Sequence, residues 1–553
     1  MRDKKILETI KNSTDFIILL LLTFLISFFY LCSANNLTGM LDGDGYTHSL
    51  IAENIYKTGS INYEMPYKLF TGTKINNKPT YSPIGYTQFY HLALATFNNI
   101  LNLNLFSPAF SILINILNTS LIYLILKRNK YIRFIVPFSI LLFTSHRSLF
   151  INFIEPFLLT MFLCAIFFIS KLSLQKKEKN KLWLLGFASY FLGCFAVTKH
   201  LGLFDGTLIV AILFVYFLIK KKFKFSIIAI FIFITVAFVP LCAQLKGVGS
   251  LGYGVGTLAI PKYIPFSGLI SNYFFNSKFQ PLTGLTGRKL SYQRDTTIKE
   301  NIILMSNYFN NFGYNIQSKL NLLTLLLIFI STGFILKKNS LVGIVLIAVF
   351  ASEFFFLNFE NLRITQYNIV LTSLFFFLLF YPVQLLFTLP RFSFINKKIY
   401  WPLFVTLLVL CLSGNFISLQ HKKIFANTGR WNPNQEKLYE MVSLYLKENE
   451  EFTDKVFLAS DIQFGYHTKR DYIWFSPLFY EGNDEDEIDK YLELVKNYFD
   501  AEYFLLSSVN FRNRGLYDHI PQKSVEFLEN NKKIELIKEF REGEEFIKIY
   551  RLL

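Results

Sequence analysis

The chain has 553 residues, of which 52% are hydrophobic, and a net charge of +17 at pH 7. Its apolar residues are gathered in blocks of about 18 to 22, long enough to cross roughly 30 Å of hydrocarbon as helices, so a soluble protein is excluded. Residues 1–420 hold 37 Lys and Arg against 14 Asp and Glu, whereas residues 421–553 hold 19 against 25. A basic membrane part with an acidic tail indicates topology signals and lipid headgroups rather than nucleic acid.

The apolar blocks predict a polytopic α-helical membrane protein with about eleven transmembrane helices. The first block follows a basic start without a convincing cleavage site, so we expect a retained helix rather than a signal peptide. A further segment, 84–101, is interrupted by polar residues such as His91 and Asn98 and is expected to lie in the membrane interface. The predicted spans are 16–33, 106–126, 134–147, 151–170, 182–198, 203–219, 225–245, 319–336, 341–357, 366–388 and 399–419.

The basic loops predict the orientation, because Lys and Arg in short loops stay cytoplasmic. With the N-terminus inside and 84–101 not counted as a span, all basic loops fall on the cytoplasmic side of a plasma (inner) membrane. The large loops 34–83 and 246–318 then lie outside, which makes the outer face the expected working face. The basic loops are 127–133, 171–181, 220–224, 337–338 and 391–398.

Residues 421–553 predict a small soluble α/β domain outside the membrane, following a transmembrane domain of residues 1–420. The runs at 455–460, 501–508, 534–540 and 545–553 are typical of strands. Helical stretches are expected at 435–448 and 486–499, with apolar residues at helical spacing. This domain has neither a G-x-G-x-x-G loop nor a Walker pattern, so nucleotide binding there has little support.

The cysteines argue against a disulfide framework or a zinc site. All five lie in or beside apolar segments and none forms a C-x-x-C pair. We therefore expect no required cofactor, and a divalent metal is not supported.

Asp42 and Asp44, flanked by Gly43 and Gly45, follow the first predicted span. One interpretation is a carboxylate that serves as general base or as a ligand for a divalent ion. The other is an N-capping aspartate before a helix. The residues alone leave both open.

Other charged groups collect at the predicted outer ends of the spans, where charge costs less than at the middle of the bilayer. Lys78, Lys199 and Arg363 are candidate ligands for a lipid phosphate, since ammonium and guanidinium groups bind phosphate. Simpler interpretations are a snorkelling Lys78 and ion pairs within turns. The turn pairs would join Arg147 to Glu155, Lys199 to Asp205 and Glu360 to Arg363, and His146 and His200 lie beside them.

With these residues in place, the sequence resembles the C-type superfamily of polytopic glycosyltransferases, which includes protein O-mannosyltransferases and lipid A aminoarabinose transferases. Asp44, Ala52 and Gly59 keep the spacing of that family's motif after the first span. Lys78-Pro79 is similar to its K-P-P-like motif. The glycine-containing span ending at Thr198-Lys199, Arg363 followed by Tyr367, and the soluble tail are further matches.

The chain also departs from the family pattern. Gly45 stands in place of a second acid, Thr80 in place of a second proline, and His48 in place of a tyrosine. The missing acid puts a metal-bridging pair of carboxylates in doubt and leaves Asp44 as the main candidate for the base.

The resemblance implies transfer of a sugar from a polyprenyl-phosphate-linked donor to an acceptor hydroxyl on the outer face, with inversion. Asp44, or Asp42, would take the proton, and Lys78, Lys199 and Arg363 would hold the phosphate. Supporting residues of the pocket would be His48, Arg147, Glu155, His200 and Glu360. The acceptor is a lipid, glycan or protein. Alternatives are a lipid-linked polysaccharide polymerase or ligase, a transporter or flippase of envelope lipids, and a non-catalytic scaffold.

Overall fold

The computed structural model describes the chain in separate stretches, which are the basis of everything below. They are residues 14, 16–28, 43–61, 73–75, 78–80, 88–103, 109–126, 154–249, 260–261, 280–281, 293–294, 300, 341–356, 370, 373–374, 433–459, 463–474, 489, 492–493, 496–497, 500–508, 526–527 and 529–553.

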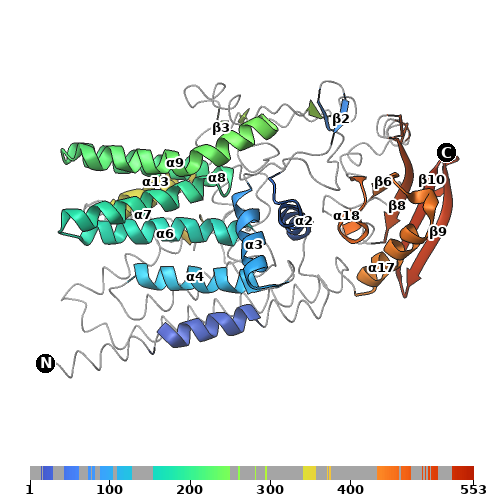
Figure 1. Ribbon diagram of the computed structural model, residues 1–553, viewed down its shortest axis with the longest axis horizontal. Coiled ribbons are helices and arrows are strands. Elements are labelled where there is room, and N and C mark those ends of the chain that lie inside the picture. The colour runs from blue at the N-terminus through green and yellow to red at the C-terminus, as the bar shows by residue number, and fades with distance from the viewer. Residues whose placement is uncertain are drawn as a thin grey trace.

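A bundle of roughly parallel apolar helices forms one end of the molecule (Figure 1). Three helices of the described stretches are long and apolar enough to cross a membrane: α6 (Ile154–Leu174), Leu201–Ile219 within α8, and α9 (Phe223–Val248). The whole of α8 covers His200–Ile219. The other bundle helices are Phe16–Phe28, α4 (Ala109–Ile125), α7 (Glu178–Ala196) and α13 (Leu341–Phe356).

These helices coincide with seven of the predicted spans, from the first to the one at 341–357. The predicted spans 134–147, 319–336 and 399–419 lie outside the described residues, as does nearly all of 366–388. The described residues therefore support a membrane protein and leave the total of eleven spans as a prediction.

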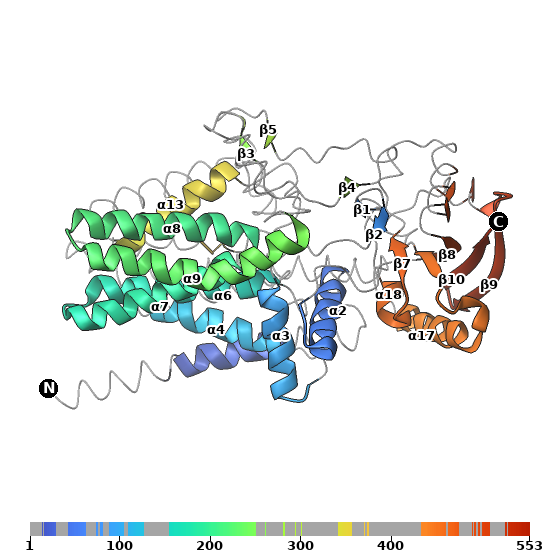
Figure 2. The same cartoon turned by 45° about the horizontal axis from the view of Figure 1, so that its top comes forward.

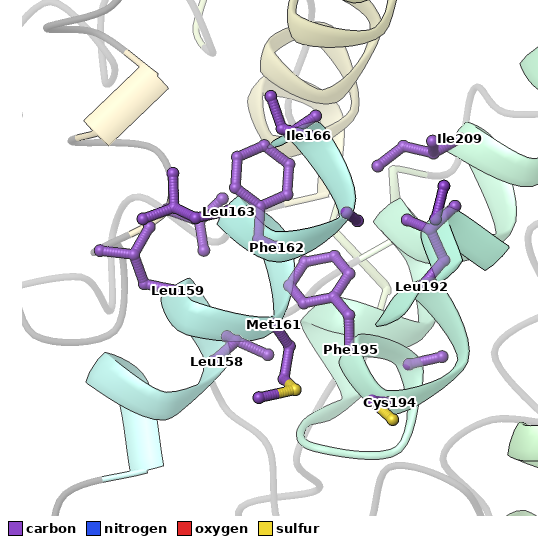
Figure 3. Close-up of a cluster of buried hydrophobic side chains, with 14 of the residues drawn as sticks. Leu158, Leu159, Met161, Phe162, Leu163, Ile166, Leu192, Cys194, Phe195 and Ile209 are labelled. Atoms are coloured by element: carbon purple, nitrogen blue, oxygen red, sulfur yellow. The ribbon is translucent and has the colours of Figure 1, made fainter. Parts of the chain in front are cut away.

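Buried hydrophobic side chains of α6, α7 and α8 form a cluster in the core of the bundle (Figure 3). Phe162 of α6 and Phe195 of α7 are fully buried, with ring centroids 5.6 Å apart. Two glycines allow close packing of α7 against its other neighbours, α9 and α8. A Cβ on Gly193 would lie 2.7 Å from Val236 of α9, and one on Gly202 would lie 2.0 Å from the carbonyl oxygen of Phe195.

Two further helices, α2 (Gly43–Thr58) and α3 (Phe89–Ile100), lie across one end of the bundle (Figures 1 and 2). The 12 residues of α3 reach only about 18 Å at 1.5 Å per residue, too short to cross the hydrocarbon layer. This agrees with the expectation that segment 84–101 does not span. Its buried residues are Tyr90, His91, Leu94, Ala95 and Asn98.

Short strands join the two predicted outer loops. β1 (Thr73–Ile75) pairs antiparallel with β2 (Lys78–Thr80) and also with β4 (Gln280–Pro281). A parallel pair, β3 (Ile260–Pro261) with β5 (Gln293–Arg294), lies within the second loop. The hairpin of β1 and β2, whose second strand begins with Lys78, is thus tied to the loop predicted at 246–318.

The C-terminal part is an α/β domain with a five-stranded sheet in the order β7-β6-β8-β10-β9. β6 (Val456–Ala459) is parallel to β7 (Tyr472–Trp474) and to β8 (Ala501–Ser507). β10 (Glu545–Leu552) is antiparallel to β8 and β9 (Ile534–Glu542). Helix α17 (Pro433–Glu448), the 3₁₀ turn η3 (Glu450–Phe452) and the short helix α18 (Gln463–Thr468) complete its described elements.

Four strands and α17 match the runs predicted from the sequence, whereas β7 was not predicted. With three residues, β7 is too short to show an alternating pattern. The domain's core is aromatic. Phe452 lies 4.9 Å from Tyr503 and 6.0 Å from Phe457 between ring centroids, and all three are buried.

Candidate functional site

Helix α2 contains the spaced motif found in the sequence. Asp44 is the second residue of the helix, in its first turn, where the helix dipole favours a negative charge. Ala52 is fully buried against the core, and its small side chain permits close packing. Gly59 has φ = +64°, and its N–H donates to the carbonyl oxygen of Ile55 at 2.9 Å, which ends the helix with a left-handed cap. Two of the three motif residues thus have a clear structural role.

His48 lies one turn after Asp44 in α2 and contacts His91 of α3. The Nδ1 of His48 and the Nε2 of His91 are 2.8 Å apart, and both side chains are buried. Burial, helped by the positive charge of Lys199, lowers the pKa of His48 to about 3. Burial and the neighbouring His48 lower the pKa of His91 well below its usual value. A hydrogen bond between two neutral imidazoles, in which one ring N–H donates to a nitrogen of the other ring, therefore joins α2 to α3.

Tyr90 fills the space between this histidine pair and the bundle. Its ring lies 5.6 Å from the His48 ring in an edge-on arrangement and 5.6 Å from Phe157 of α6. Burial, followed by the negative charge of Glu155, raises its pKa well above 10. Among the described residues the Tyr90 hydroxyl has no hydrogen-bond partner, although it is buried. The phenol therefore remains protonated and available as a donor.

A buried ion pair lies at the same end of the bundle. The Nζ of Lys199 is 2.6 Å from Oε1 of Glu155, and both side chains are 5% exposed. Glu155 is in the first turn of α6, and Lys199 occupies the extended N-cap position of α8. The close approach at Gly202 holds the α7–α8 turn in place. This ion pair joins α6 to the start of α8 across 44 residues of sequence.

This pairing differs from the interpretations based on neighbouring residues. The sequence suggested pairs of Glu155 with Arg147 and of Lys199 with Asp205. The structure joins Glu155 to Lys199, whereas Arg147 lies outside the described residues, so its pair with Glu155 stays a prediction. Glu155 meets Lys199 because α6 and α7 are antiparallel neighbours, which brings the start of one beside the end of the other. Asp205 is fully buried one turn into α8.

The remaining predicted site residues are placed only in part. Lys78 begins β2, opposite Ile75 of β1, and His200 begins α8. Asp42, Arg147, Glu360 and Arg363 lie outside the described residues. In the described stretches no group of three or more His, Cys, Asp and Glu could hold a metal ion. The described cysteines, Cys164, Cys194 and Cys242, are free thiols.

Sequence reasoning missed the roles of Tyr90 and His91. A signal was present, because Gln88, His91, Ala95 and Asn98 recur at helical spacing. All four are buried, so the polar stripe of α3 faces the protein and not the solvent. Tyr90 and His91 of α3 thus join a buried polar cluster with His48, Glu155 and Lys199. Its two charged members, Lys199 and Glu155, balance each other in the ion pair.

The fold of the whole chain is similar to that of ArnT. It matches the structure of ArnT from Cupriavidus metallidurans bound to undecaprenyl phosphate with a TM-score of 0.53 and 9% sequence identity, over 96% of this chain and 97% of that chain. It matches the same protein in the apo state with a TM-score of 0.54 and 9% identity, over 97% and 98% of the two chains. No protein-family model and no curated protein matches the sequence. At this identity the similarity concerns the fold.

Proposed function

We propose that this chain is a membrane glycosyltransferase that moves a sugar from a polyprenyl-phosphate-linked donor to an acceptor hydroxyl on the outer face of the membrane. The observation that carries the proposal is the similarity in fold to a protein seen with undecaprenyl phosphate, because it extends over 96% of the chain and includes the C-terminal domain. The short motif on α2 adds a carboxylate at the end of the bundle where the buried polar cluster lies.

In the proposed reaction Asp44 is the general base. The acceptor oxygen bonds to the anomeric carbon of the sugar as the bond from that carbon to the phosphate oxygen breaks, with inversion. The hydroxyl proton passes to Asp44, and the carrier phosphate leaves with the bonding electrons. The helix dipole favours a negative charge in the first turn of a helix, which suits a base that must be deprotonated before the reaction. Asp42 is the alternative base.

Lys78 and Arg363 are the proposed ligands of the carrier phosphate, and cations there would stabilise the charge of the leaving group. Lys199 is proposed with them, but Glu155 already balances its charge at 2.6 Å. We therefore assign to Lys199 mainly the positioning of the α7–α8 turn. The sugar and the acceptor are left open, and the reaction as proposed needs no metal.

The test is a transfer assay with the full chain in liposomes that contain undecaprenyl-phosphate-linked sugars as a panel of donors. Release of undecaprenyl phosphate in the presence of extracted envelope lipids and glycans as acceptors is the expected result. Asp44→Asn should reduce this release by about 100-fold or more, the usual contribution of a general base, while the variant inserts into the membrane in normal amounts. Asp42→Asn is the matched control and should retain activity.

The outcomes separate the alternatives. If Asp42→Asn is inactive and Asp44→Asn is active, the base is Asp42. If both variants are fully active, the proposed chemistry is wrong. A flippase would move the donor across the bilayer without consuming it, and a polymerase would lengthen a lipid-linked glycan. Both are visible in the same liposomes by mass spectrometry of the lipids.

A further inference from the structure

Helix α2 is held from two sides. Its inner face contacts the bundle through Ala52 and the His48–His91 pair. On the opposite side it faces the C-terminal domain, and the short helix α18 lies directly against it (Figures 1 and 2). The C-terminal domain thus touches the helix that carries the proposed base.

The carboxylate of Glu53 makes a polar contact between these parts. Oε2 of Glu53, in the middle of α2, accepts a hydrogen bond from Nζ of Lys469 at 2.8 Å. Its Oε1 accepts one from Lys57 of the same helix at 2.6 Å. Both carboxylate oxygens are therefore occupied, one within α2 and one across the domain boundary. Glu53 is 19% exposed, so water reaches the bridge only in part.

The backbone at Lys469 is in an unusual conformation. Lys469 ends α18 with φ = +55°, in the left-handed region that residues with a side chain seldom adopt. Its N–H donates to the carbonyl oxygen of Gly465 at 3.1 Å, as in a left-handed helix cap, a position where glycine is the usual residue. At this backbone conformation a lysine makes the folded chain less stable than a glycine would. Such strain is a reason to look for a role of the side chain.

The segment that presents Lys469 is firmly held by the C-terminal domain. The guanidinium of the next residue, Arg470, donates to the carbonyl oxygens of Phe452 and, at 2.6 Å, Leu446. Phe464 of α18 is fully buried against Phe457, with ring centroids 5.0 Å apart. The lysine therefore projects from a rigid support toward α2.

We propose that the Lys469–Glu53 bridge fixes α2 against the C-terminal domain, and that Lys469 is thereby a positioning residue for the proposed base on that helix. The claim that Lys469 positions the base rests on the proposed function, whereas the claim that the bridge fixes α2 is independent of it. Lys469 acts through Glu53, which lies nine residues after Asp44 on the same helix.

The test uses Lys469→Gly in the full chain. This change removes the bridge and relieves the backbone strain together, so the C-terminal domain itself is not destabilised. The matched control is Asp500→Gly, because Asp500 also has a positive φ, +51°, and precedes β8 in the same domain. Lys469→Arg is the conservative variant, since it keeps the charge and can bond the carboxylate.

Two readouts are measured. Hydrogen exchange of the α2 amides should speed up by about threefold to fivefold in Lys469→Gly, in line with the loss of one partly exposed ion pair, and should stay unchanged in Asp500→Gly. Turnover of Lys469→Gly should fall, with an unchanged KM for the donor. In Lys469→Arg both the exchange of the α2 amides and the turnover should be close to those of the original chain. Unchanged exchange in Lys469→Gly, or equal effects in Asp500→Gly, would overturn the proposal.

The two proposals fail in different ways. If α2 exchanges faster in Lys469→Gly but Asp44→Asn is fully active, the bridge is confirmed and the base is wrong. If Asp44→Asn is inactive but Lys469→Gly changes neither exchange nor turnover, the base remains and the positioning role is refuted.

Discussion

The ion pair of Glu155 and Lys199 gives the sharpest test of the bundle. Both side chains are 5% exposed and 2.6 Å apart, so each charge depends on the other for compensation. At an effective dielectric constant of about 20, Coulomb attraction at this distance is about 6 kcal/mol, and the cost of desolvating both charges cancels most of it. The pair is therefore nearly neutral for stability as a unit, whereas either charge alone is costly.

We expect each single change, Glu155→Met or Lys199→Met, to lower the free energy of unfolding by about 3–5 kcal/mol, because it leaves an uncompensated buried charge. The double variant Glu155→Met/Lys199→Met should lie within about 1 kcal/mol of the original chain, since two apolar side chains of similar volume replace the pair. The assay is equilibrium unfolding of the purified chain in mixed micelles, followed by tryptophan fluorescence.

The exposed pair of Lys222 and Glu178, at the other end of the bundle, is the matched control. Its side chains are 32% and 68% exposed, so water screens them, and the corresponding Met variants should have far smaller effects. If the two single changes at Glu155 and Lys199 were harmless, or if their effects simply added in the double variant, the interpretation as a mutually dependent buried pair would be refuted.

Two further predictions concern packing and pH. Gly202→Ala should destabilise the bundle by about 1–3 kcal/mol, because the added Cβ would lie 2.0 Å from the carbonyl oxygen of Phe195. The control is Gly186→Ala, whose Cβ would lie 3.5 Å from the side chain of Ile232, and it should leave thermal unfolding unchanged. Since the pKa of His48 falls from 6.5 to about 3 on folding, the unfolded chain binds the extra proton between these values. The contribution of His48 to stability should therefore decline by about 1.4 kcal/mol per pH unit as the pH falls from 6.5 toward 3, and His91, whose pKa is also lowered, adds to the slope in the same direction. His48→Gln should make the slope shallower by about that amount; an unchanged slope would contradict a buried neutral imidazole.

The long elements were predictable from the sequence because their signal is local. The apolar blocks at 151–170, 203–219 and 225–245 correspond to α6, α8 and α9. Within 84–101 the structure has the 12-residue helix α3, and its position in the membrane interface stays a prediction. Strands β8 and β10 were predicted from their apolar runs. The mixed order of the C-terminal sheet was not, because strand pairing depends on contacts far apart in the chain.

The candidate site was predictable by residue type but not by partner. Glu155 and Lys199 were singled out as charged groups beside apolar segments, and His48 because it stands in place of a tyrosine in the family motif. Their partners were not found, since Lys199 meets Glu155 only when α6 and α7 pack side by side. His91 was noted merely as an interruption, although helical spacing placed it on the inward face of α3.

The bridge between Glu53 and Lys469 also has a consequence for how the chain is made. The two residues are 416 positions apart, so at about 5–20 residues per second a ribosome needs roughly 20–80 s to synthesise the second after the first. During that interval α2 lacks its contact with the C-terminal domain. A nascent or truncated chain therefore holds the motif helix on one side only, and its final arrangement is reached after translation is nearly complete.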